Sequence, residues 1–204
     1  MEAAEDAEAG RAGRATLENW MYPPPGGWTW DQVTDAELPF DWELLDGSIV
    51  VQGLPVLWHN RVRDRLYYQL ESACREPFAV GIAPYTVIDD HNVPKPDVMV
   101  FDESQLDIDT VAQVPGERVA LAVEVMSEGS RHADRFSKPT LYAEAGIRSY
   151  WRIERAEGGL PVVYEFRLHH ETGIYETPRP MHTGRFVTSA PFPVDIDFGT
   201  LIEV

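Results

Sequence analysis

The sequence lacks the features that define three classes of protein. Its single cysteine, Cys74, excludes an internal disulfide and a multi-cysteine zinc site. No apolar stretch approaches the roughly 18 consecutive residues that a membrane-spanning helix needs. Residues 1–10 carry four acidic side chains and no apolar segment, unlike a secretory signal peptide. We therefore expect a protein of the reducing cytoplasm with no membrane partner.

Basic side chains are scarce. The chain has 17 Lys and Arg residues against 34 Asp and Glu residues, which gives a net charge of −17 at pH 7. Such a chain repels a polyanion at long range, so binding to nucleic acid would depend on a local basic region. Residues 1–50 carry a net charge of −9, whereas residues 127–155 carry +2. The second segment is therefore the expected place for contacts with phosphate.

The length and composition allow one ordinary domain. With 204 residues, of which 44% are hydrophobic, the chain can bury a core. Residues 1–15 have almost nothing to bury, and a run of prolines and glycines flanked by three tryptophans follows them. We predict an acidic disordered tail and a Pro/Gly/Trp-rich arm over residues 1–36, and a single domain over residues 37–204.

The apolar pattern predicts a mixed α/β fold. Two apolar runs joined by Asp46 and Gly47 are typical of a β-hairpin. Apolar residues recur every four positions from Val62 to Cys74, which indicates one buried stripe of a helix. Further strands are predicted at residues 98–101, 119–125, 149–154 and 161–168. The expected architecture is a central mixed β-sheet flanked by helices, with an N-terminal β-hairpin and a β-rich C-terminal part.

Two carboxylates are the first candidates for a functional site. Glu124 lies inside an almost continuous apolar run, where burying a carboxylate costs several kcal/mol unless it is paired, protonated or bound to a metal. Asp97 opens the preceding apolar strand. Two carboxylates that converge from adjacent strands suit Mg²⁺. The alternative is structural: Glu124 pairs with Arg118 or Arg148, and Asp97 caps a turn.

Lys138 lies 14 residues beyond Glu124, where a polar turn over residues 127–137 leads to a helix. A lysine at that place can orient a water molecule and stabilise charge that develops on a phosphate. The alternative is a solvated lysine at a helix N-terminus. Pro139 suits the first position of a helix, so we expect Lys138 to cap the helix with a backbone conformation outside the α region.

The order of these residues resembles the PD-(D/E)XK superfamily, whose members have the restriction-endonuclease-like fold. More closely, the chain is similar to the Uma-type restriction endonucleases. Four segments carry the resemblance, which as a whole covers about residues 37–190. They are the hairpin WELLDGSIVV (residues 42–51), His59, PKPDVMVF (residues 94–101), and LAVEVMSEGSRHADRFSKPTLYAEAGIRSYWRIE (residues 121–154).

The resemblance implies a metal site formed by Asp97 and Glu124, with Lys138 as the lysine of the motif. It also implies a supporting role for Glu43, which can complete the metal shell, although a surface carboxylate is an equal alternative. His59 is either a proton carrier near neutral pH or a capping and packing residue. The chain departs from the usual pattern at three positions. Met126 replaces the lysine of glutamate-x-lysine, Glu128 adds negative charge, and Pro139 follows the lysine.

The expected function is that of a metal-dependent endonuclease that uses Mg²⁺, or Mn²⁺, to hydrolyse phosphodiester bonds in DNA. Phosphate contacts are expected from the basic segment, by Arg131, Arg135, Arg148 and Arg152. The resemblance also implies a homodimer. The alternative is a nuclease-like domain that no longer cuts and acts as a binding or regulatory module.

Overall fold

A computed structural model describes residues 13–176 and 182–203. The chain forms two compact units, a smaller one of Met1–Gln52 with Val87–Pro94 and a larger one of Gly53–Thr86 with Lys95–Val204. Most of the expected disordered tail lies outside the described residues. The proposed boundary at residue 37 stays a prediction.

The smaller unit contains the expected hairpin, formed by β1 (Trp42–Leu45) and β2 (Ser48–Val51). Asp46 and Gly47 both have positive φ, 49° and 67°, as a tight two-residue hairpin turn requires. Gly47 has a second constraint, because a Cβ atom there would lie 2.7 Å from the Cα of Gly27. The arm therefore packs closely on the hairpin turn, after which it forms the short helix α2 (Trp30–Val33).

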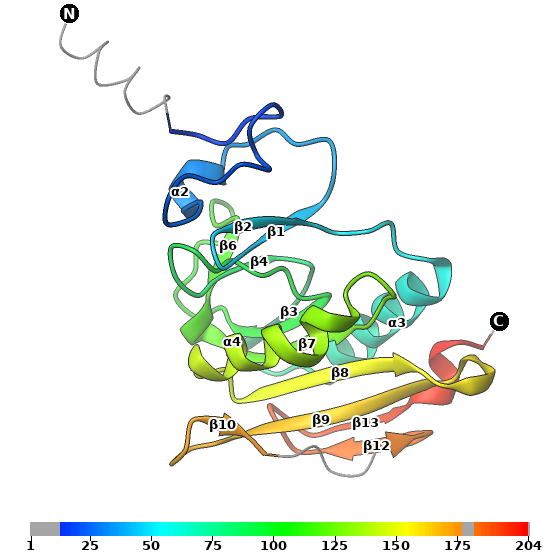
Figure 1. Cartoon of the computed structure of the whole chain (residues 1–204). Coiled ribbons are helices and arrows are strands. Elements are labelled where there is room, and N and C mark those ends of the chain that lie inside the picture. The colour runs from blue at the N-terminus through cyan, green and yellow to red at the C-terminus, as the bar shows by residue number, and fades with distance from the viewer. Residues whose placement is uncertain (1–12, 177–181, 204) are drawn as a thin grey trace, which may run out of the picture. The chain divides into compact units, whose positions relative to one another are not determined.

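The larger unit is built on a seven-stranded sheet (Figure 1), which confirms the central mixed sheet. Six strands run in the order β10-β9-β8-β7-β5-β3, and β11 also pairs with β9. Only β7 and β8 pair in parallel among the described strands of this sheet. The strands are β3 (Phe78–Ile82), β5 (Val98–Asp102), β7 (Val119–Val125), β8 (Ser149–Arg155), β9 (Pro161–His169), β10 (Ile174–Tyr175) and β11 (His182–Thr183). Two separate pairs are β4 (Tyr85–Val87) with β6 (Gln113–Pro115), and β12 (Arg185–Thr188) with β13 (Val194–Asp197).

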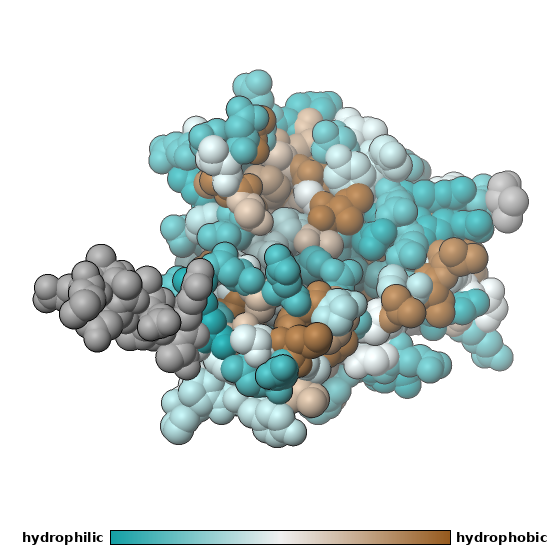
Figure 2. Space-filling view, turned by 90° about the horizontal axis from the view of Figure 1, so that it is seen from above, coloured by the Kyte–Doolittle hydropathy of each residue, from teal (hydrophilic) through white to brown (hydrophobic). Residues whose placement is uncertain are grey.

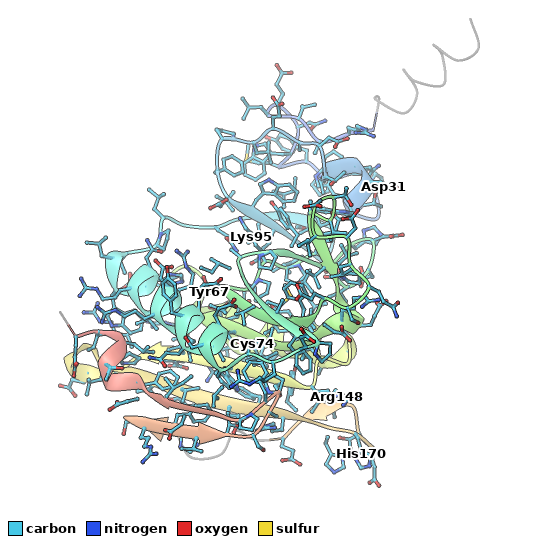
Figure 3. All side chains as sticks on the ribbon, turned by 180° about the vertical axis from the view of Figure 1, so that it is seen from behind. Asp31, Tyr67, Cys74, Lys95, Arg148 and His170 are labelled. Atoms are coloured by element: carbon cyan, nitrogen blue, oxygen red, sulfur yellow. The ribbon has the colours of Figure 1, made fainter. Side chains whose placement is uncertain are left out.

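Helices α3 (Leu57–Ala73) and α4 (Lys138–Glu144) cover opposite faces of this sheet. Figure 1 shows α4 in front of the strands, and Figure 3, from behind, shows α3 in front of them. The predicted apolar stripe of α3 is confirmed for Val62, Leu66 and Leu70, which are fully buried. No described helix has the length and apolar character needed to cross a membrane.

The alternation along β7 decides which side chains face which helix. Leu121, Val123 and Val125 belong to the core cluster that contains the stripe of α3. Because successive residues of a strand point to opposite faces, Glu124 points to the α4 face. The Glu124 carboxylate therefore lies between β7 and α4. Hydrophilic side chains cover much of the surface in Figure 2, where apolar residues form separate patches.

Candidate active site

Asp97 lies immediately before β5, next to Glu124 on the neighbouring strand. The register pairs Val98 with Val123, and its continuation brings Asp97 opposite Glu124. The Asp97 Oδ2 atom accepts a hydrogen bond of 2.7 Å from the backbone N–H of Val125. Where β5 begins, the Asp97 carboxylate therefore accepts from a backbone N–H of β7, and this bond fixes its side chain beside the end of β7 that carries Glu124.

Glu124 is 3% exposed and is held by two side chains of α4. Its Oε1 atom accepts hydrogen bonds from Lys138 Nζ at 3.0 Å and from the Tyr142 hydroxyl at 2.7 Å. These contacts account for the burial of a carboxylate in an apolar strand. Arg118, one of the partners considered from sequence, donates to the carbonyl of Asp102 and to the side chain of Gln105.

The expected cap position of Lys138 is wrong. Residues 131 and 132 are already helical, a wide π-type turn follows at Ala133–Ser137, and Lys138 has an α conformation with φ −63° and ψ −40°. Pro139 has no N–H to bond the carbonyl four residues earlier, and its ring crowds that carbonyl. A wider turn before the proline accommodates both effects. The helix therefore continues through Pro139 and turns Lys138 inward.

Lys138 is 2% exposed, which excludes a solvated lysine. Its ammonium lies between Glu124 and Asp134, with 3.6 Å from Nζ to Asp134 Oδ1. Asp134 is itself 1% exposed. Two carboxylates around one ammonium keep a lysine charged inside a protein, where an isolated ammonium is strongly disfavoured.

Asp134 and Tyr142 were not singled out from the sequence as site residues. Their spacing from Lys138, four residues before and four after, is the signal that identifies them, because residues four apart share a helix face. Tyr150 joins this group through a 2.7 Å hydrogen bond from its hydroxyl to the backbone carbonyl of Asp134. Burial, and then the charge of Glu124, raise the pKa of Tyr150 well above its usual value, so its hydroxyl stays a donor.

His59 connects α3 to the same site. It is buried on α3 three residues before Val62, on the same side of the helix as the apolar stripe. Its Nε2 atom lies 3.3 Å from Asp97 Oδ1. Burial on its own lowers the pKa of His59, but the hydrogen bond and the negative charge of Asp97 outweigh it and raise that pKa. The imidazole is therefore an ion-pair partner of Asp97 at mildly acidic pH.

Comparison with known proteins identifies the family to which this chain belongs. The family model Uma2, described as "Putative restriction endonuclease", matches residues 30–199. The chain belongs to the Uma2 family. A similar solved structure is the crystal structure of a "putative nuclease belonging to DUF820" from Anabaena variabilis, with a TM-score of 0.57 and 15% sequence identity. The match covers 81% of this chain and 93% of that one, and it supports the fold. No curated protein matches the chain significantly.

The remaining candidate residues of this Uma2 protein occupy different places. Glu43 lies on β1 in the smaller unit and is 3% exposed, so it is not a surface carboxylate. Arg135 and Arg152 both bind the Glu154 carboxylate, at 2.5 Å and 2.8 Å. Arg131 and Arg148 are exposed. Arg148 lies directly before the first residue of β8, away from the end of that strand at which Glu154 lies. The roles of Glu43 and of the four arginines stay predictions.

The donor set is compatible with a hard divalent cation. The described residues contain no cluster of three or more His, Cys, Asp or Glu side chains that could hold a metal. Mg²⁺ does not need such a cluster, because one or two carboxylates with water and substrate phosphate oxygens satisfy its six positions. Asp97 and Glu124, side by side at adjacent strand ends, are two oxygen donors of this kind.

The His59–Asp97 pair predicts a pH-dependent stability. A histidine whose pKa is raised on folding stabilises the fold fully below its unfolded pKa, and this contribution disappears as the pH rises through the folded pKa. We expect His59→Gln to lower the free energy of unfolding more at mildly acidic pH than at alkaline pH. Urea unfolding of both proteins without metal, at two pH values on either side of that window, measures the difference. An equal loss at both values would contradict the assignment.

Proposed function

We propose that this Uma2 protein is a metal-dependent endonuclease that hydrolyses phosphodiester bonds in DNA, with Mg²⁺ or Mn²⁺ as cofactor. The observation that carries the proposal is the position of the Lys138 ammonium, 3.0 Å from the carboxylate of Glu124, the residue that lies opposite Asp97 on the neighbouring strand. Membership of a family described as restriction endonucleases supports the same reaction class.

Each residue has a role in this proposal that its contacts support. Asp97 and Glu124 would hold the cation, which supplies Lewis-acid stabilisation of the phosphate and a more acidic water. Lys138 places a fixed positive charge beside that position, where charge develops on the phosphate. Asp134 and Tyr142 hold Lys138 and Glu124 in place through contacts of 3.6 Å and 2.7 Å. His59, on the other side of Asp97, is placed to carry a proton.

The charge of the chain sets a condition on substrate binding. With a net charge of −17, long-range attraction to DNA is absent, so binding depends on local contacts such as Arg131 and on the cation itself. We therefore expect cleavage to be strongest at low ionic strength and to fall with added salt. A cytoplasmic location and a homodimer remain part of this proposal.

The test is cleavage of supercoiled plasmid at low salt with Mg²⁺ or Mn²⁺, and with EDTA as the metal-free reference. Asp97→Asn removes one charged ligand, and Asp102→Asn makes the same change at the other end of β5, where the Asp102 carboxylate accepts hydrogen bonds from Ser104. We expect nicking that needs metal, that falls at least about 100-fold in Asp97→Asn and that is retained in Asp102→Asn.

Two results would contradict the proposal. Equal activity of the wild type and Asp97→Asn would show that the site lies elsewhere. Metal binding by the wild type without cleavage of plasmid, single-stranded DNA or RNA would favour the binding-module alternative. Mn²⁺ binding is read independently as an increase in melting temperature, which follows from preferential binding to the folded state.

A further inference from the structure

A pocket with both polar and apolar walls lies away from the candidate active site. It has a volume of about 720 Å³ and is bounded by the turn before β8, the end of β9 and the segment after β12. Figure 3 labels Arg148 and His170, two of its residues, near the same end of the sheet. The lining is Gly146, Arg148, Ser149, Arg167, Leu168, His170, Ser189 and Ala190.

The position of this pocket separates it from Glu124. Ser149 pairs with Leu121 on β7, whereas Arg152 pairs with Glu124. Three residues of strand correspond to about 10 Å. A ligand in the pocket is therefore at the other end of β7 and β8 from the two carboxylates.

The charge of the pocket is unusual for this chain. Its lining contains two arginines and a histidine and no Asp or Glu, although the protein has twice as many acidic as basic residues. The Arg148 side chain is exposed, and its guanidinium makes no hydrogen bond or ion pair with any other described residue. Its charge is thus available to a ligand.

Arg167 is held in a fixed orientation at the same pocket. Its Nε atom donates to Glu165 Oε1 at 2.9 Å, and a terminal nitrogen donates to the Thr188 hydroxyl, which in turn donates to Glu165. Glu165 is buried, but the Arg167 side chain is 33% exposed. A guanidinium fixed in this way binds an oxyanion with little loss of side-chain entropy.

We propose that this pocket binds the phosphate group of a nucleotide. Two guanidinium groups and the hydroxyl of the exposed Ser189 match the oxygens of a phosphate, for which arginine forms two-pronged hydrogen bonds. The volume is within the range of roughly 300–1,000 Å³ that is typical of small-molecule sites, and it exceeds the need of a bare phosphate ion. Leu168, Ala190 and the His170 ring offer surfaces for the sugar and the base.

The test is isothermal titration of the full chain in EDTA, so that no metal-dependent contact contributes. The probes are a deoxynucleoside 5′-monophosphate, inorganic phosphate and a short single-stranded oligonucleotide. Arg148→Gln removes the exposed charge, and Arg61→Gln is the matched control, because Arg61 is an exposed arginine on α3 outside the pocket lining. Both substitutions are at exposed positions, and near-UV circular dichroism verifies that each variant is folded.

We expect the monophosphate to bind the wild type and Arg61→Gln equally, and Arg148→Gln roughly tenfold more weakly. We expect Glu124→Gln to bind the monophosphate as the wild type does, because Glu124 is outside the pocket. The nucleotide-binding proposal and the nuclease proposal can therefore fail independently of each other. Oligonucleotide binding with the same dependence on Arg148 identifies a nucleic-acid strand as the source of the phosphate, and its absence identifies a free nucleotide. No binding, binding of inorganic phosphate alone, or equal affinities of Arg148→Gln and Arg61→Gln would overturn the proposal.

Discussion

Glu124→Gln is expected to abolish metal-dependent cleavage while the fold remains intact. Glutamine keeps an oxygen that accepts hydrogen bonds from Lys138 and Tyr142, but it loses the negative charge that a divalent cation needs. We expect activity to fall by more than the factor of about 10–100 that is typical of losing a residue that only orients a metal ligand.

The same substitution is expected not to lower stability. In the wild type, the Glu124 and Asp134 carboxylates share the Lys138 ammonium, and both are almost completely buried. With glutamine at position 124, one ammonium faces one carboxylate, and the repulsion between the two acids is gone. The free energy of unfolding of Glu124→Gln should therefore be equal to or higher than that of the wild type. Such a gain in stability is common when a residue that activity requires is replaced.

Plasmid cleavage and urea unfolding of the same preparations measure both effects. Glu144→Gln is the matched control, since Glu144 is an exposed glutamate at the end of α4. It should leave cleavage and stability nearly unchanged. A Glu124→Gln protein that unfolds at much lower urea concentration would show that Glu124 is a structural ion-pair residue, as the alternative interpretation of the sequence holds.

The strand that carries Glu124 could be predicted because its signal is local. Seven residues, six of them apolar, with turns on both sides indicate a buried strand in any context, and burial of the one carboxylate follows directly. The hairpin at Asp46 and Gly47 was equally predictable, since few residue pairs accept positive φ at two successive positions. These features depend on neighbouring residues in the chain.

The start of the second helix could not be predicted, because its cause is not local. Pro139 at the first helical position is the better local solution, and it leaves Lys138 outside the helix. The structure instead has a π-type turn at Ala133–Ser137, and Lys138 is buried between Glu124 and Asp134. The contacts of the ammonium with Glu124 on β7 and with Asp134 therefore outweigh the cost of an irregular turn. Helix propensities do not include that contribution, because they describe a residue without its tertiary contacts.

Lys138→Met is expected to cause the largest loss of stability of any single change at the site. Methionine fills a similar volume but leaves the Glu124 and Asp134 carboxylates buried without the ammonium that lies between them. Removing one partner of a buried ion pair typically costs about 3–5 kcal/mol. Cleavage is lost as well, because the positive charge beside Glu124 is absent.

The control for this change is Lys95→Met. The chain has only two lysines, and the Lys95 ammonium lies 5.4 Å from the ring centre of Tyr85. Loss of a cation–π contact of this kind costs about 0.5–1 kcal/mol. If Lys138→Met changes the free energy of unfolding by no more than Lys95→Met does, Lys138 is solvated and its burial between two acids is wrong.

A double variant tests whether repulsion between the carboxylates is the cause of the loss. In Lys138→Met with Glu124→Gln, a single buried carboxylate remains at the cluster, so the cost of losing the ammonium should be smaller than in the wild-type background. We expect a coupling free energy of at least about 1 kcal/mol in the double-mutant cycle. We also expect Lys138→Met alone to regain stability as the pH is lowered, because one of the two acids can then fold in its neutral form. Additive losses and a stability that does not rise at lower pH would show that the methionine variant fails through packing, and that the ammonium has no electrostatic role at Glu124.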